Sequence, residues 1–181
     1  MANLRFNKVT KNVQNISFDC GVHSINEYIK ESYFPMICQQ AYTYSIESDN
    51  VILGFYQILF RDVVINDFPE NISDYDSEIK DGKITAAHIR FIAIDKKFQR
   101  KKIGTNVLQA IIKSIDDFSN YMPIRVITID ALVHLVDWYK QNGFVKMINN
   151  SEGQDGFSES MYFDCMKFSD ELMQYLELCN M

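Results

Sequence analysis

The stretch from Ile89 to Thr105 constrains the fold more than any other part of the chain. It opens with an apolar run rich in Ile and Phe, which is typical of a buried strand. Basic residues follow, and a helical pattern then begins, with apolar residues at spacings of three to five: Ile103, Val107, Leu108, Ile111, Ile112 and Ile115. Because the first turn of a helix has unpaired N–H groups and a dipole that favours negative charge, this arrangement predicts an anion-binding turn.

The turn itself reads Gln99-Arg100-Lys101-Lys102-Ile103-Gly104-Thr105, and it matches neither G-x-x-x-x-G-K-[ST] nor G-x-G-x-x-G. It resembles the acetyl-CoA turn of the GCN5-related N-acetyltransferase (GNAT) family, [QR]-x-x-G-x-[GA], although Lys102 replaces the first glycine. The resemblance implies that acetyl-CoA phosphates bind residues 99–105. Without that glycine, we expect a close backbone approach only if Lys102 keeps a negative φ, with its side chain pairing with a phosphate.

A second signature follows in the right order. The segment from Trp138 to Phe144 resembles the family pattern [FL]-Y-x-x-x-G-F. Before it come a buried-strand run at 124–129 and a helical pattern that carries Leu132, Leu135, Val136 and Tyr139 on one face. Asn142-Gly143 is typical of a helix C-terminus.

The whole chain predicts an α/β fold with a GNAT-like mixed sheet of about six to seven strands flanked by helices, in a single domain over residues 1–181. Strands are expected at 4–9, 42–46, 51–60, near 89, at 124–129, at 144–145 and at 161–166. Helices are expected from Val22 to near Pro35, from Ile103, through Tyr139, and after Ser169 with Leu172, Leu176 and Cys179 inward. Residues 47–50 are expected to form a hairpin turn, and 149–158 a loop.

The family resemblance implies roles for individual residues. The backbone of Phe91, Ile92, Ala93 and Ile94 is expected to pair with the pantetheine of acetyl-CoA as an added strand does. Tyr139 is expected to protonate the departing thiolate. His88, at the start of the same strand, is the candidate base that deprotonates the acceptor amine, and ordered water is the alternative.

The segment from Phe18 to Ile29 resembles the opening F-x-C-G-x-x-x-L-[ND]-x-[WFY]-L of one GNAT branch. That branch contains toxins of toxin–antitoxin pairs, which acetylate the amino acid carried by charged tRNA. The alternative interpretation is a capped amphipathic helix, with Phe18 at its entry and Ile25 and Ile29 facing the core.

Charge argues against tRNA as the acceptor. The chain has 18 Lys+Arg against 24 Asp+Glu, a net charge of −6, and five cations (Lys96, Lys97, Arg100, Lys101 and Lys102) lie at the predicted phosphate turn. Without these five, 13 remain against 24, so the rest carries −11. Since phosphate contacts dominate nucleic-acid affinity, tight tRNA binding is not expected, unless a local patch forms from Lys8, Lys11, Lys30, Lys140 and Lys146. An acidic run suits a cationic acceptor or a solvated loop: Asp67, Glu70, Asp74, Asp76, Glu78 and Asp81.

The remaining composition narrows the class of protein. No stretch of eighteen apolar residues is present, so no membrane span is expected. Four cysteines without C-x-x-C spacing indicate reduced thiols in a cytoplasmic protein and no metal site: Cys20, Cys38, Cys165 and Cys179.

Three functions stand at this point. The first is an acetyl-CoA-dependent N-acetyltransferase that acts on a primary amine of a small molecule or protein. The second is a tRNA-directed toxin with an antitoxin partner. The third is a degenerate family member that binds acetyl-CoA without catalysis, for which the lost glycine at Lys102 is the support. The sequence leaves open the acceptor and whether the chain forms a homodimer.

Overall fold

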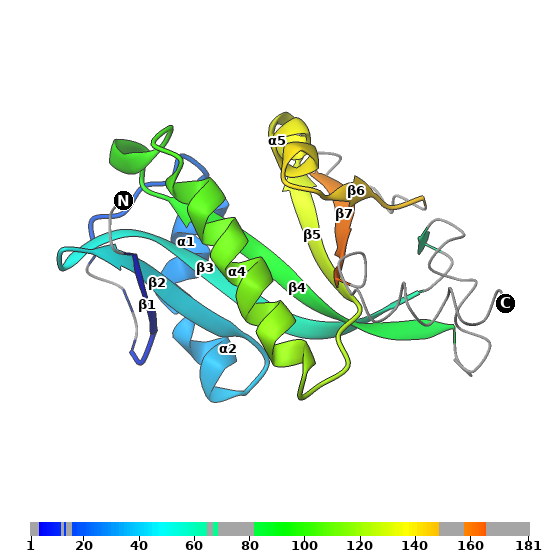
Figure 1. The fold of residues 1–181 in the computed structure, drawn as a ribbon. Helices are drawn as coiled ribbons and strands as arrows, with labels where there is room; N and C mark the ends of the chain where they lie inside the picture. Colours follow the sequence, from blue (N-terminus) through cyan, green and yellow to red (C-terminus); the bar gives the residue numbers. More distant parts are fainter. Residues whose placement is uncertain are drawn as a thin grey trace, which may run out of the picture. The chain divides into compact units, whose positions relative to one another are not determined.

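The computed structural model describes residues 4–11, 13, 16–64, 67–68, 82–148 and 158–165. The strands of these residues form one mixed seven-stranded sheet, in the order β1-β2-β3-β4-β5-β7-β6 (Figure 1). The predicted α/β fold class is confirmed. The strands are β1 (Arg5–Lys8), β2 (Tyr42–Ser48), β3 (Val51–Val64), β4 (Lys83–Ile94), β5 (Val126–Leu132), β6 (Val145–Lys146) and β7 (Ser158–Asp164).

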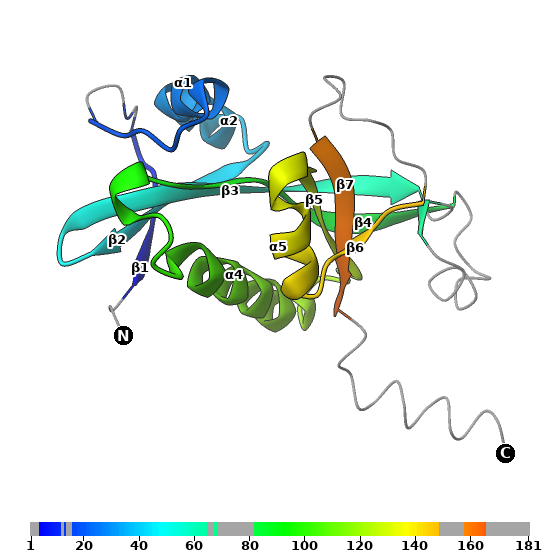
Figure 2. The same ribbon diagram turned by 90° about the horizontal axis from the view of Figure 1, so that it is seen from above.

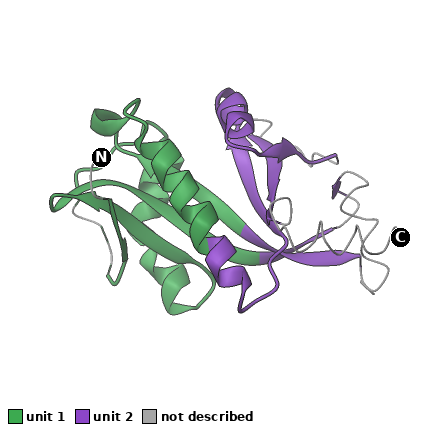
Figure 3. Cartoon of the chain, in the orientation of Figure 1, with its two compact units in different colours: residues 1–60, 88–114 green, residues 61–87, 115–181 purple. Residues whose placement is uncertain are grey.

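Helices and short 3-10 turns connect these strands. They are α1 (His23–Glu31), α2 (Tyr33–Ile37), η2 (Lys96–Phe98), α4 (Ile103–Ser119), η3 (Val133–Leu135) and α5 (Val136–Gln141). The backbone forms two compact units, which Figure 3 colours separately. Unit 1 comprises Met1–Phe60 and His88–Ser114, and unit 2 comprises Arg61–Ala87 and Ile115–Met181.

Unit 1 has helices on both faces of its strands. Figure 2 shows α1 and α2 on one face and α4 on the other. The core on the α1 and α2 face joins Val9, Ile29, Met36, Phe55, Phe91 and Ala93. Phe18 packs edge-on against Phe55 of β3, at 5.2 Å between ring centroids, so it joins this core through a strand. The predicted side-chain cap of α1 is wrong, because the N-cap residue is Val22, whose side chain forms no capping hydrogen bond.

Two local predictions in unit 1 need correction. The helix expected to end near Pro35 gives way to a second short helix, α2, which contains Pro35. Proline is tolerated there because it lies in the first turn, where a helical N–H has no partner. The hairpin turn is only Asp49-Asn50, since Glu47 and Ser48 belong to β2. Asp49 and Asn50 have φ of 50° and 64°, the left-handed pair that a two-residue hairpin turn requires.

Unit 2 is built on antiparallel pairs of β7 with β5 and with β6. Its core contains Val63, Phe68, Ile84, Ala86, Val126, Met147 and Tyr162. Leu132, predicted to be helical, ends β5, and the helical segment starts with η3 and continues as α5. The apolar spacing used to predict this helix therefore included Leu132, which belongs to the preceding strand. Gly143 has φ of +90° directly after α5, which confirms the predicted helix C-terminus.

Some predictions concern residues outside the described part. They are the C-terminal helix after Ser169, the loop through 149–157, and the acidic run apart from Asp67.

Gly54 is a position where β3 lies very close to β4. A Cβ atom at Gly54 would lie 2.3 Å from the carbonyl oxygen of Ala93. We expect Gly54→Ala to lower the free energy of unfolding by about 1–3 kcal/mol, because the backbone of β4 has to move to admit the methyl group. Urea denaturation measures it. Val51→Ala, at an exposed position of the same strand, serves as the control and should change stability by less than about 0.5 kcal/mol. Equal stability of Gly54→Ala and wild type would contradict this close approach.

Candidate functional site

A buried carboxylate begins the candidate site in unit 1. Asp95 follows β4 directly and is only 5% exposed. Its Oδ1 accepts a hydrogen bond of 2.9 Å from the backbone N–H of Lys97, which caps η2, and its Oδ2 accepts one from the N–H of Asp19. The N–H of Asp95 donates to the carbonyl of Leu53 on β3. The chain is therefore fixed where it leaves the strand Phe91–Ile94.

Gln99 opens the predicted phosphate turn and fixes it from within. Its Nε2 donates to the carbonyl oxygens of Cys20, at 2.9 Å, and Ile94, at 2.8 Å. The side chain thus joins the turn to the end of β4 and to the loop before α1. Both hydrogen bonds come from the amide nitrogen of Gln99. The side chain therefore positions the turn, a role that the sequence prediction did not specify.

The backbone after Gln99 takes an unusual path. Arg100 has φ of 58° and Lys102 has φ of 60°, both in the left-handed region. Lys102 therefore does not keep the negative φ that the sequence analysis required of it; it adopts the conformation for which the family pattern has glycine. Its carbonyl accepts from the N–H of Asn106, so Lys102 directly precedes the first turn of α4. A left-handed residue followed by a helical one directs successive N–H groups into one concavity, which binds anions.

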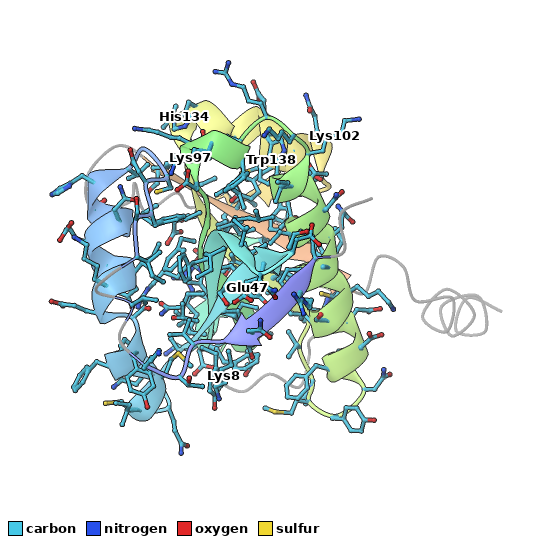
Figure 4. All side chains as sticks on the ribbon, turned by 90° about the vertical axis from the view of Figure 1, so that its left-hand side faces the viewer. Lys8, Glu47, Lys97, Lys102, His134 and Trp138 are labelled. Atoms are coloured by element: carbon cyan, nitrogen blue, oxygen red, sulfur yellow. The ribbon has the colours of Figure 1, made fainter. Side chains whose placement is uncertain are left out.

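Charge surrounds this concavity. Lys96, Lys97, Arg100, Lys101 and Lys102 are all exposed, and Figure 4 labels Lys97 and Lys102 near the start of α4. Lys96 is paired with Asp19 at 2.8 Å. Lys101 lies over the ring of Phe98, 5.5 Å from its centroid. Within the described part of the chain, Arg100, Lys101 and Lys102 form no ion pair with a carboxylate, so their charge is available to an anion.

The N-terminal segment braces the turn from the α1 side. Asp19 accepts from the Lys96 ammonium, from Asn26 Nδ2 and from the N–H of Gly21. The hydrogen bond from Lys96 and, after it, those from Asn26 and Gly21 lower the pKa of Asp19 to about 2. Asn26 Oδ1 in turn accepts from the N–H of Cys20. The positions in the pattern F-x-C-G-x-x-x-L-[ND] therefore hold the predicted phosphate turn in place, a role that no spacing in the sequence indicated.

His88, the candidate base, lies in unit 1 at the position where β4 enters that unit. It is buried, with 6% of its surface exposed. Its side chain is thus enclosed by the protein in this conformation.

Tyr139, the candidate acid, lies on α5 in unit 2 and is 4% exposed. Its ring contacts Trp138 and Phe144 edge-on, at 4.6 Å and 5.5 Å between centroids. Burial among these rings raises the pKa of the Tyr139 hydroxyl. The hydroxyl is therefore protonated at neutral pH, and in this conformation it is a weaker acid than a solvated tyrosine.

Comparison with protein families decides the class. Residues 76–160 match the model of the Acetyltransferase (GNAT) domain. Residues 76–160 therefore carry a GNAT acetyltransferase domain. The predicted family and the prediction of an N-acetyltransferase are confirmed. No curated protein sequence matches the chain significantly.

Solved structures with the same fold include toxins of toxin–antitoxin systems. A tyrosine-to-phenylalanine mutant of KacT is 16% identical, with a TM-score of 0.75 over 91% of this chain and 96% of that one. AtaT complexed with acetyl-methionyl-tRNAfMet is 17% identical, with a TM-score of 0.77 over 94% and 99%. AtaTR bound with acetyl-CoA is 17% identical, with a TM-score of 0.73 over 91% and 95%. At this identity, the likeness establishes the GNAT fold.

Among the described residues, neither a cluster of metal-ligating side chains nor a membrane-spanning helix is present. No three His, Cys, Asp or Glu side chains among them cluster as metal ligands do. No helix within the described ranges has the length and apolarity needed to cross a bilayer.

The left-handed Lys102 makes a prediction about stability. An L-residue costs about 1–2 kcal/mol in this conformation, so we expect Lys102→Gly to raise the free energy of unfolding by about 1 kcal/mol. Lys101→Gly removes the same charge at a position without positive φ and should instead lower it by about 0.5–1 kcal/mol. Urea denaturation of both variants without ligand compares them. If both glycine variants were destabilised equally, Lys102 would not be strained.

Proposed function

We propose that this GNAT protein transfers an acetyl group from acetyl-CoA to a primary amine. The observation that carries the proposal is the turn after β4. There, left-handed Lys102 precedes α4, and three cations without carboxylate partners in the described residues surround the N–H groups. Backbone donors with Lys and Arg beside them suit the pyrophosphate and phosphate of a CoA ester.

The residues of unit 1 fit such a ligand along its length. Residues 99–105 would hold the phosphates, and the backbone of Phe91–Ile94 would pair with the amides of the pantetheine. The structure AtaTR bound with acetyl-CoA, which has the same fold, supports this choice of ligand. When bound, acetyl-CoA supplies an activated acetyl thioester. A backbone N–H of the strand is the candidate donor to the oxyanion that develops there.

Tyr139 is the proposed proton donor. A tyrosine phenol is protonated at neutral pH, so a proton is available for a thiolate leaving group. His88 or an ordered water is the proposed base that takes the proton from the acceptor amine. The role of Tyr139 comes from the match of Trp138 to Phe144 with the family signature. The role of His88 comes from its position at the start of the strand that is proposed to hold the cofactor.

We also propose that the two compact units act as one domain. Strands β3 and β4 each contribute residues to both units, so neither unit is a continuous chain segment. The family match at 76–160 likewise takes residues from both.

Aminoacyl-tRNA is a second candidate acceptor. The fold likeness to AtaT complexed with acetyl-methionyl-tRNAfMet favours it, and so does the N-terminal pattern, which here braces the phosphate turn. A structure of the KacTA–DNA complex and one of AtaT bound to the C-terminus of its antitoxin AtaR make an antitoxin partner part of this proposal.

Local charge argues for a soluble amine or a protein amine instead. Of the five lysines named above as a local patch for tRNA, Lys30 pairs with Glu27, Lys140 with Asp137 and Lys146 with Glu159. Lys8 lies over the ring of Tyr42. Paired cations bind phosphate less strongly, and the net charge outside the turn is negative. The third function, a non-catalytic acetyl-CoA binder, lost part of its support because Lys102 adopts the conformation of the missing glycine.

Tyr139→Phe tests the catalytic proposal. We expect acetyl-CoA to raise the melting temperature of wild type and variant alike, by the equivalent of about 2.7 kcal/mol at a hundredfold excess over Kd. Turnover of an amine acceptor should fall by roughly 10²–10⁴, because only the proton donor is lost. Lys101→Glu combined with Lys102→Glu is the matched control, with weakened binding instead. Unchanged turnover in Tyr139→Phe would show that the Tyr139 hydroxyl is not the proton donor and that this residue only packs in the core.

Expression in bacteria separates the two acceptors. If the acceptor is a soluble or protein amine, cells that express the wild type grow normally, and free tRNA is not retarded in a gel at ~150 mM salt. Tyr139→Phe is the control that keeps the fold. Growth arrest by the wild type alone, with acetylated aminoacyl-tRNA accumulating, would instead establish aminoacyl-tRNA as the acceptor.

A further inference from the structure

A chain of polar side chains runs through the core of unit 1 on the α1 face. Gln57 on β3 and Thr43 on β2 are completely buried. Gln57 Nε2 donates to Thr43 Oγ1 at 2.8 Å, and Thr43 Oγ1 donates to the carbonyl of Ser32. Because the amide nitrogen is engaged in this way, the amide oxygen of Gln57 points in the opposite direction.

That oxygen accepts a hydrogen bond from Arg90 on β4. Its Nη1 donates to Gln57 Oε1 at 3.2 Å and to the hydroxyl of Tyr28 at 2.5 Å. The Tyr28 hydroxyl donates in turn to Gln57 Oε1 at 3.0 Å. The guanidinium also lies 5.3 Å from the centroid of the Tyr28 ring. All of these partners are neutral, so Arg90 is held in one place without being neutralised.

The donors of Arg90 divide into two groups. A guanidinium has five N–H groups, of which Nη1 carries two, and the two hydrogen bonds above account for both. The Nε and Nη2 groups form the other edge and have no partner among the described residues. Arg90 is exposed, so this edge reaches solvent. Two parallel N–H groups of this kind match the oxygens of a carboxylate or phosphate.

Arg90 lies on β4 directly before Phe91–Ile94, the segment proposed to pair with the pantetheine of acetyl-CoA. Phe91 packs edge-on against the ring of Tyr28, at 5.9 Å between centroids, and belongs to the same core as Phe55. Consecutive residues Arg90 and Phe91 thus both contact Tyr28 on α1. The backbone of Ile92 is only two residues, or about 7 Å, further along the strand.

We propose that Arg90 binds an oxyanion of the acceptor, so that this enzyme selects amines that carry a carboxylate or phosphate close to the reacting nitrogen. The proposal rests on the acetyltransferase function proposed above and adds a substrate class to it. It also opposes the expectation, drawn from the acidic run, of a purely cationic acceptor.

Paired acceptors test the proposal. One pair is an amino acid and its amide, and the other is an aminoacyl ester of adenosine with and without a 5′-phosphate, so that the two oxyanion sources are measured separately. Wild type should prefer the anionic member of at least one pair. Arg90→Gln should lower kcat/KM for that member by about tenfold to a hundredfold, as expected for loss of a charge-assisted bidentate contact, and leave the neutral member within about threefold.

Three further variants exclude a merely structural role. Arg5→Gln removes an exposed arginine of the same unit, which contacts Asn50, and should keep the preference. Arg90→Lys retains the positive charge but lacks the parallel N–H groups of the guanidinium. It should therefore recover only part of the preference for the anionic acceptor. Tyr28→Phe removes one acceptor that fixes Arg90 and should raise KM for the anionic member without changing acetyl-CoA binding. An unchanged preference in Arg90→Gln would overturn the proposal.

A readout without turnover keeps this test separate from the catalytic proposal. The Nε–H resonance of Arg90, assigned by its loss in Arg90→Lys, should shift on titration with inorganic phosphate or acetate in ¹⁵N-labelled protein. If the wild type acetylates no amine but the resonance shifts and saturates, the acetyltransferase proposal fails and the oxyanion site stands. A resonance that does not move at millimolar anion would overturn the oxyanion site, whatever the enzyme acetylates.

Discussion

The buried carboxylate of Asp95 is the contact on which the candidate site of unit 1 depends. It caps η2 through the N–H of Lys97 and accepts from the loop before α1 through the N–H of Asp19, at the point where β4 ends. Gln99 adds two hydrogen bonds between the same three segments. Since a buried carboxylate is costly unless its oxygens are satisfied, the strand end, the turn and the N-terminal loop are held together as one structure.

This bracing explains how a turn of like charges can persist. Five cations gather within seven residues, and only Lys96 has a carboxylate partner, Asp19, among the described residues. Two of the five residues also have left-handed backbone. Repulsion and strain of this kind are tolerated where the surroundings fix the conformation, and they are typical of a site built for a ligand. An anionic ligand would relieve the repulsion, which ties the energetics of the turn to its proposed function.

The candidate acid Tyr139 and the solvent-facing edge of Arg90 depend on burial in different ways. Tyr139 is enclosed by aromatic rings, which disfavour the phenolate and keep its proton. Arg90 keeps its charge, and a buried neutral network through Gln57 and Thr43 fixes its direction while one edge stays open to solvent. Burial thus favours the protonated form of the Tyr139 hydroxyl, whereas the buried side chains beside Arg90 fix the orientation of its guanidinium.

The sequence alone was enough to predict the fold class, the strand–turn–helix unit around residues 89–105 and the GNAT resemblance, because these follow from local patterns: the apolar period of α4, the glycine after α5 and two short signatures. It could not show that Lys102 adopts positive φ, that Asp19 and Asn26 brace the turn, or that Arg90 meets Gln57. These pairs lie up to 77 residues apart in the chain. Only the tertiary structure decided them, because a hydrogen bond between distant residues depends on how strands pair and helices pack, and no local spacing encodes that.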